Sequence, residues 1–111
     1  MSNQFKNQMR EVMSTAHRIF ALTGESWSVC VKRAWANRHV KVAMKVMVVR
    51  FSYLKTTGEV REAQGTLLDS IVPPTKGTGR KKNEDVQCYF DVEAQGWRSF
   101  RKSNLIGICH E

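Results

Sequence analysis

The stretch "FSYLKTTGEVREAQGTLL", residues 51–68, predicts two β-strands joined by a tight turn. Aromatic and β-branched residues before the turn, with no glycine or proline among them, are typical of a strand. Thr56–Gly58 supply the turn, and residues 59–68 are expected to pair back as the second strand, with Gly65 near its end. The pair is therefore predicted to be a β-hairpin.

Upstream of this hairpin, the hydrophobic period changes from 3.6 to 2 at about residue 40. One parity is shared by Val40, Val42, Met44, Val46 and Val48, and the other by Val49, Phe51 and Tyr53. Two interpretations stay open. A β-bulge near Val48 and Val49 would shift the register by one residue, or the strand starts only near Val46.

Downstream of the hairpin, Pro73, Pro74 and the glycines and cations after them predict a long exposed loop. Three more strands follow, at "VQCYFDVE" (86–93), "WRSFRK" (97–102) and "NLIGICH" (104–110), with a turn at "AQG" (94–96). Five short antiparallel strands fit a small barrel, because closure removes the exposed edges of a sheet.

The first third of the chain predicts two amphipathic helices. Apolar residues from Phe5 to Phe20 recur at spacings of three and four, and a second stripe runs from Trp27 to Trp35. Gly24 is suited to end the first helix, and Ser26 is suited to cap the second. We therefore expect an α+β protein in which residues 1–39 form a helical hairpin and residues 40–111 form a five-stranded antiparallel barrel, together one compact unit.

Several spaced motifs in residues 49–108 resemble the WYL-like Sm/SH3-type β-barrel proteins of phages and mobile elements. These are Phe-x-Tyr-x-Lys, a Gly turn, Arg-Glu-Ala-x-Gly-Thr-Leu, and later Tyr-Phe-Asp-Val with Trp-Arg-Ser-Phe-Arg. The upstream "AHRIFALTGESWSVCVKRAW" looks like a helical segment found before such barrels. The resemblance implies an SH3/Sm-like barrel. The larger WYL domains are regulatory sensors implicated in binding nucleic acid or nucleotide-like ligands, although their Trp-Tyr-Leu triplet is absent here.

The composition favours a binding protein with an anionic partner. A length of 111 residues suits one domain, and a net charge of +8 draws a protein toward polyanions such as nucleic acid. The alternative is that these charges are only a solvated surface. Three cysteines without paired spacing predict neither a disulfide framework nor a zinc site. No signal peptide or membrane span is evident, so we expect a protein of the bacterial host cytoplasm, or one associated with a virion.

The fourth predicted strand carries the main candidate site. Trp97, Ser99 and Arg101 point to one face of an extended strand, and Arg98, Phe100 and Lys102 point to the other. Phe100 is expected in the core, with Arg98 at the barrel mouth. The predicted anion-binding face consists of Arg98, Arg101, Lys102, Trp97, Arg61 and Tyr53, because guanidinium groups pair with phosphate and aromatic rings stack on bases. Alternatively, Trp97 and Phe100 are core residues and the cations are solvated.

The sequence offers two further candidate binding sites. The loop cations Arg80, Lys81 and Lys82 could reach phosphates without reading sequence, or they could simply keep the loop soluble. Trp27 and Trp35 are candidate anchors for a protein partner, since tryptophan and arginine dominate interface hot spots. The alternative to a nucleic-acid-binding factor is therefore a protein-interaction module that binds, and could thereby inhibit, a host or phage protein. A minor virion component is a third interpretation.

Catalysis is not expected. His17, His39 and His110 are scattered along the chain, without a nucleophile or carboxylate at a motif spacing. Asp91 and Glu93 share a strand face but are expected to balance neighbouring arginines rather than to act as an acid–base pair. The sequence predicts no enzyme, no cofactor and no metal site.

Overall fold

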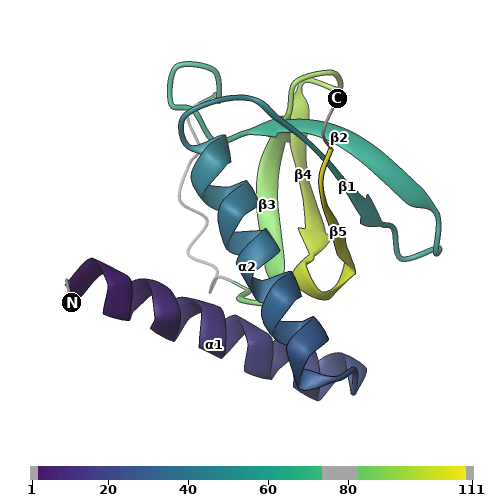
Figure 1. Cartoon of the computed structure of the whole chain (residues 1–111). Helices are drawn as coiled ribbons and strands as arrows, with labels where there is room; N and C mark the ends of the chain where they lie inside the picture. Colours follow the sequence, from purple (N-terminus) through teal and green to yellow (C-terminus); the bar gives the residue numbers. More distant parts are fainter. Residues whose placement is uncertain (1–2, 74–82, 110–111) are drawn as a thin grey trace.

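The computed structural model describes residues 3–73 and 83–109, in which two helices are followed by a five-stranded antiparallel sheet (Figure 1). The predicted α+β class is confirmed. The elements are α1 (Asn3–Thr23), α2 (Trp27–Met44), β1 (Val49–Leu54), β2 (Val60–Thr66), β3 (Val86–Asp91), β4 (Gly96–Arg101), the 3₁₀-helix η1 (Lys102–Asn104) and β5 (Leu105–Ile108).

The two helices pack through the apolar stripes that the sequence predicts. Val12, Ala16 and Ile19 of α1 are buried against Cys30 and Ala34 of α2. Their spacings of three and four residues place them on one face of each helix. In Figure 1, α1 crosses the lower end of α2 and then extends away from the sheet toward the N-terminus.

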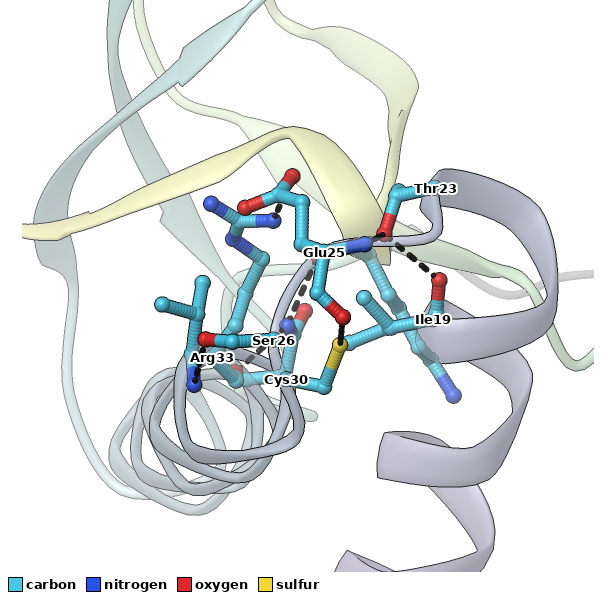
Figure 2. Close-up of polar contacts among 9 residues, drawn as sticks. Ile19, Thr23, Glu25, Ser26, Cys30 and Arg33 are labelled. Carbon is cyan, nitrogen blue, oxygen red and sulfur yellow. Dashed lines mark hydrogen bonds and ion pairs between the residues drawn. The ribbon is translucent and has the colours of Figure 1, made fainter.

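The turn between the helices is held by local hydrogen bonds (Figure 2). Gly24 has φ +69°, the left-handed conformation that closes a helix as predicted. The Thr23 hydroxyl donates to a carbonyl of the preceding helical turn at 2.9 Å and accepts from the Glu25 backbone N–H at 3.2 Å. The Ser26 hydroxyl accepts from the Val29 N–H at 3.4 Å, so Ser26 is the N-cap of α2.

A carboxylate on α1 connects this helix to the C-terminal half of α2. Glu11 pairs with Arg38 at 2.6 Å and also with Lys41, both on α2. Partial burial alone would raise the pKa of Glu11, but the hydrogen bond from Lys41 and the charges of Lys41, Arg38 and Lys102 outweigh it, and the pKa is lowered. The folded state therefore favours the ionised form of this carboxyl group.

This pairing predicts a pH-dependent contribution to stability. A folded-state pKa below the unfolded value means that the stabilisation is present above the unfolded pKa and is lost as the pH falls through the folded pKa. Because the Glu11 side chain is 39% exposed, we expect Glu11→Gln to lower the free energy of unfolding by only about 0.5–1 kcal/mol at neutral pH. Urea denaturation of both proteins at neutral and at strongly acidic pH checks this, and an undiminished difference in acid would contradict it.

Helix α2 is longer than the sequence predicted. It continues to Met44, and β1 begins only at Val49. The prediction of a strand from about residue 40 is therefore wrong. Val40 and Met44 are fully buried, whereas Val42 between them is 43% exposed. Positions four residues apart share both a strand parity and a helical face, so the alternating pattern did not distinguish the two structures. Of the two interpretations, the later strand start is the closer one.

The strand order is β4-β3-β2-β1-β5, with every neighbouring pair antiparallel. β1 and β2 form the predicted hairpin, in register from Val49↔Gly65 to Leu54↔Val60. A register irregularity does occur in β1, but it lies between Ser52 and Tyr53 against β5, not near Val48 and Val49. The two outermost strands, β4 and β5, are joined by η1.

The barrel and α2 share one core. Four aromatic rings meet at its centre with centroid separations of 5.1–6.2 Å. The buried members are Val40, Met44, Val49, Phe51, Tyr53, Ala63, Tyr89, Phe100 and Leu105. The buried Thr66 hydroxyl also donates toward the carbonyls of Met44 and Met47, each at 3.1 Å, where α2 ends. The helix therefore covers one side of the barrel as part of the same packed unit (Figure 1).

Candidate nucleic-acid interface

The candidate site lies where β2 and β3 separate. In the described residues these strands pair only at Gly65↔Asp91 and Thr66↔Phe90, so the first part of β2 and the first part of β3 diverge. A hollow of about 370 Å³ occupies this region. We call it the basic hollow; its lining residues are Tyr53, Leu54, Lys55, Thr56, Thr57, Arg61, Val86, Ser99, Phe100, Arg101 and Asn104.

Three of the predicted site residues line the basic hollow together: Tyr53, Arg61 and Arg101. Tyr53 is only 6% exposed and its hydroxyl lies 2.8 Å from the Tyr89 hydroxyl. Burial raises the pKa of Tyr89 well above its usual range, and the hydrogen bond with Tyr53 acts in the same direction. The inner side of the hollow is therefore aromatic, with a neutral Tyr89 phenol behind it.

Among the described residues, two cations of the basic hollow, Arg101 and Lys55, have a weak ion-pair partner or none. Arg101 is exposed and makes no ion pair within residues 3–73 and 83–109. Lys55 lies 3.8 Å from Glu59, whose side chain is 75% exposed, and such a surface pair contributes little. Arg61 lies 3.6 Å from Asp91. Arg101 and Lys55 can therefore exchange water or a loose partner for a bound anion at small cost, whereas Arg61 shares the buried carboxylate of Asp91 with Arg98.

Arg98 has a different position from Arg101. Its Nε lies 3.2 Å from Oδ2 of Asp91, a carboxylate with only 4% of its side chain exposed. The other oxygen of Asp91 accepts from the backbone N–H groups of Glu93 and Ala94 in the β3–β4 turn. Asp91 thus balances arginines, as the sequence indicated, and Arg98 lies outside the lining of the basic hollow.

Lys102 and Trp97 also lie away from this lining. Lys102 is half-buried in η1, where its carbonyl accepts from Nδ2 of Asn37 at 2.9 Å. Trp97 is 42% exposed and packs edge-on against Phe90, with ring centroids 5.7 Å apart. Trp97 shares a face of β4 with Arg101 but is four residues distant, roughly 13 Å along the strand.

The remaining predicted residues lie elsewhere. Trp27 is 40% exposed at the start of α2, with its ring 4.6 Å from that of His17. Trp35 is half-buried and packs against the core of the helical hairpin. The predicted loop cations Arg80, Lys81 and Lys82 fall outside the residues that the structure describes.

Two further hollows adjoin the first and share Asn104 with it, so the three together form a groove. One, of about 450 Å³, lies between α2 and β5 and carries Lys32 and Arg33. The other, of about 480 Å³, also contains Arg101. Their carboxylates are already paired, Glu25 with Arg33 at 2.8 Å (Figure 2) and Asp85 with Arg18 at 2.7 Å. We call the three hollows together the basic groove.

Three residues of the basic groove, Lys55, Lys32 and Asn104, were not among the site residues predicted from the sequence. Lys55 was visible as the last residue of the Phe-x-Tyr-x-Lys motif, immediately before the predicted turn. Lys32 is one of several cations on a helix, and Asn104 reaches the groove only through η1. No feature of the sequence marked either of these two residues.

Neither a metal site nor a membrane-spanning helix is present in the described residues. Within the described ranges, no three histidine, cysteine or acidic side chains lie close enough together to hold a metal ion. Neither of the two helices in that part of the chain has the length and apolar character needed to cross a bilayer.

The fold and the groove define a small Sm-like barrel with a cationic surface. The family model WYL_2, described as an Sm-like SH3 β-barrel fold, matches residues 37–106. That match covers more than half of the 111-residue chain, and the protein therefore belongs to the WYL_2 family. No curated protein and no solved structure shows significant similarity to the chain.

Proposed function

We propose that this protein binds single-stranded nucleic acid along the basic groove and acts as an accessory or regulatory factor, not as an enzyme. The observation that carries the proposal is the lining of the basic hollow. Lys55, Arg61 and Arg101 converge there, and none of the described lining residues is acidic. Cationic grooves with aromatic rings are typical of proteins that follow a single strand without reading its sequence.

The dimensions of the site favour a single strand over a duplex. A hollow of about 370 Å³ lies near the lower end of the range for small-ligand pockets, roughly 300–1,000 Å³. It can hold one nucleotide unit but cannot enclose two paired strands. The net charge of +8 supports the same class of ligand, since it attracts a polyanion over a distance.

Neutralising two cations of the basic hollow tests the proposal. We expect Lys55→Gln with Arg101→Gln to weaken binding of a single-stranded oligonucleotide by about 10–100-fold. The slope of log K against log salt should also fall by roughly two units, one for each lost phosphate contact. Fluorescence anisotropy across a salt series measures both quantities.

The matched control is Arg10→Gln with Lys45→Gln, which removes the same charge from exposed positions on α1 and after α2. Its affinity should stay within a few-fold of the wild type. Equal losses in the two double variants would show that net charge alone causes binding, and the assignment to the groove would be wrong.

The biological setting is proposed from the family resemblance. WYL-like barrels of this size are common in phages and mobile elements, so we propose that the protein acts in the cytoplasm of a bacterial host. Three free cysteines, at positions 30, 88 and 109, are compatible with a reducing compartment. Mass spectrometry of purified virions would test the alternative of a minor virion component.

A second candidate function is binding of a protein partner. The hollow between α2 and β5 is lined in part by Val29, Leu54 and Ile106, which are 36%, 38% and 53% exposed. Phe20 and Trp27 add exposed aromatic surface at the helical turn. A pull-down distinguishes the two functions. One stoichiometric protein that survives nuclease treatment would favour a protein partner, and loss of every partner would favour nucleic acid.

A further inference from the structure

The basic hollow carries more positive charge than one backbone phosphate of a strand requires. We infer that it takes a nucleoside phosphomonoester, either the phosphorylated end of a strand or a free nucleoside monophosphate. This inference deepens the proposed function, on which it rests, by naming the chemical group that the hollow recognises.

Charge is the first argument. An internal phosphodiester carries one negative charge, whereas a phosphomonoester carries about −1.5 to −2 at neutral pH. Three cations line the hollow, namely Lys55, Arg61 and Arg101, and none of its described lining residues is acidic. Glu59 and Asp91, which pair with two of these cations, lie outside the lining. The lining therefore carries more positive charge than one diester can neutralise, and a monoester neutralises more of it.

The neutral donors of the hollow are the second argument. Thr56, Thr57, Ser99 and Asn104 line the same space as the cations. A phosphomonoester presents three terminal oxygens, each a strong acceptor, whereas a diester presents two. Hydroxyl and amide donors beside guanidinium groups can satisfy the additional oxygen, and Arg101 can offer two parallel N–H bonds.

The apolar wall is the third argument. Leu54, Val86 and Phe100 line the hollow together with the polar groups, so a sugar and base can pack there while the phosphate meets the cations. Tyr53 and Phe100, only 6% and 3% exposed, close its inner side. A space of one-nucleotide size that is closed on one side suits the end of a strand better than a backbone that must enter and leave.

The test compares three ten-nucleotide oligothymidylates that carry a 5′-phosphate, a 3′-phosphate or hydroxyls at both ends. We expect the wild-type protein to bind one phosphorylated form about tenfold tighter than the hydroxyl form. Because the second pKa of a phosphomonoester is about 6, this preference should shrink as the pH falls from about 7.5 to about 5. Thymidine 5′-monophosphate should compete for the site, whereas thymidine should not.

Two single variants test whether the preference for a phosphorylated end arises in the basic hollow. Arg101→Gln should abolish the preference for the phosphorylated end, whereas Arg10→Gln on α1 should retain it. Circular dichroism of both variants checks that they are folded. Equal affinity of all three oligonucleotides for the wild-type protein overturns the inference and leaves nucleic-acid binding intact, whereas failure to bind any of them removes the proposed function as well.

Discussion

Replacing Gly65 by valine should prevent folding, and replacing it by alanine should lower the free energy of unfolding by about 2–3 kcal/mol. A Cβ atom at this position would lie 2.6 Å from Cδ2 of Tyr89 and 3.0 Å from Cε1 of Phe51. Real Cβ atoms do not approach other heavy atoms at 2.6 Å, so the ring or the strand has to move. Urea denaturation of the alanine variant, followed by circular dichroism, measures the loss.

The neighbours of Gly65 cannot move cheaply. Tyr89 is fully buried, its hydroxyl is bonded to that of Tyr53, and its ring lies edge-on to Phe51 at 5.1 Å. Interiors packed to this density respond to an added methyl group with strain. Gly65 is also one of the two positions at which β2 pairs with β3, so a shift there would disturb the connection between the two parts of the barrel.

Gly96→Ala is the matched control. Gly96 also lies in a strand and does not have a positive φ, but the nearest atom to its added Cβ is the Ala94 carbonyl oxygen at 4.0 Å. We expect its unfolding free energy to change by less than about 1 kcal/mol. The lower entropy of the unfolded alanine variant favours folding at both positions, so similar losses at Gly65 and Gly96 would show that contact with the aromatic cluster does not determine the effect.

Local signals in the sequence were sufficient for most of the fold. Alternating apolar residues predicted the strands, and Gly24 and Ser26 marked the helical turn that the structure shows. The end of α2 was not predictable from such signals, because Val40 and Met44 fit both periodicities. Only the packing of these side chains into the barrel core, which is a tertiary contact, selects the helix.

The candidate site was predictable in part, for a similar reason. Strand parity and charge indicated Tyr53, Arg61 and Arg101, which come from three strands and line one hollow. The same local reasoning grouped Arg98 with them. The partner that occupies Arg98 is Asp91, on the neighbouring strand β3, and a contact between strands is not visible in the spacing of either strand alone.

The second large effect on stability is expected for substitution of Asp91. We expect Asp91→Ala to lower the free energy of unfolding by about 2–4 kcal/mol. The substitution leaves Arg61 and Arg98 without their shared partner and removes the acceptor for two N–H groups of the β3–β4 turn. Both arginines reach solvent, with 26% and 40% of their side chains exposed. The loss is therefore smaller than for a fully buried pair.

Two companion variants separate the roles of Asp91. In Asp91→Asn the amide oxygen can still accept from the turn, while the negative charge that pairs with the arginines is lost, so the destabilisation should be about half that of alanine. Arg98→Ala should be milder still, because Asp91 keeps Arg61 as a partner. Thermal and urea denaturation of the three proteins give the order, and an asparagine variant as unstable as alanine would show that charge pairing dominates.

The same variants also separate stability from binding at the mouth of the barrel. Arg98 is occupied by a buried carboxylate, whereas Arg101 lines the hollow and has no ion-pair partner among the residues that the structure describes. Arg98→Ala should therefore lower the unfolding free energy and leave oligonucleotide affinity within a few-fold of the wild type. Arg101→Ala should have the opposite effects, weakening binding by about tenfold while the free energy of unfolding stays nearly unchanged.

If Arg98→Ala weakened binding more than Arg101→Ala while remaining folded, the Asp91–Arg98 pair would have to open for the ligand. The anion site would then lie at the β3–β4 turn instead of the basic hollow.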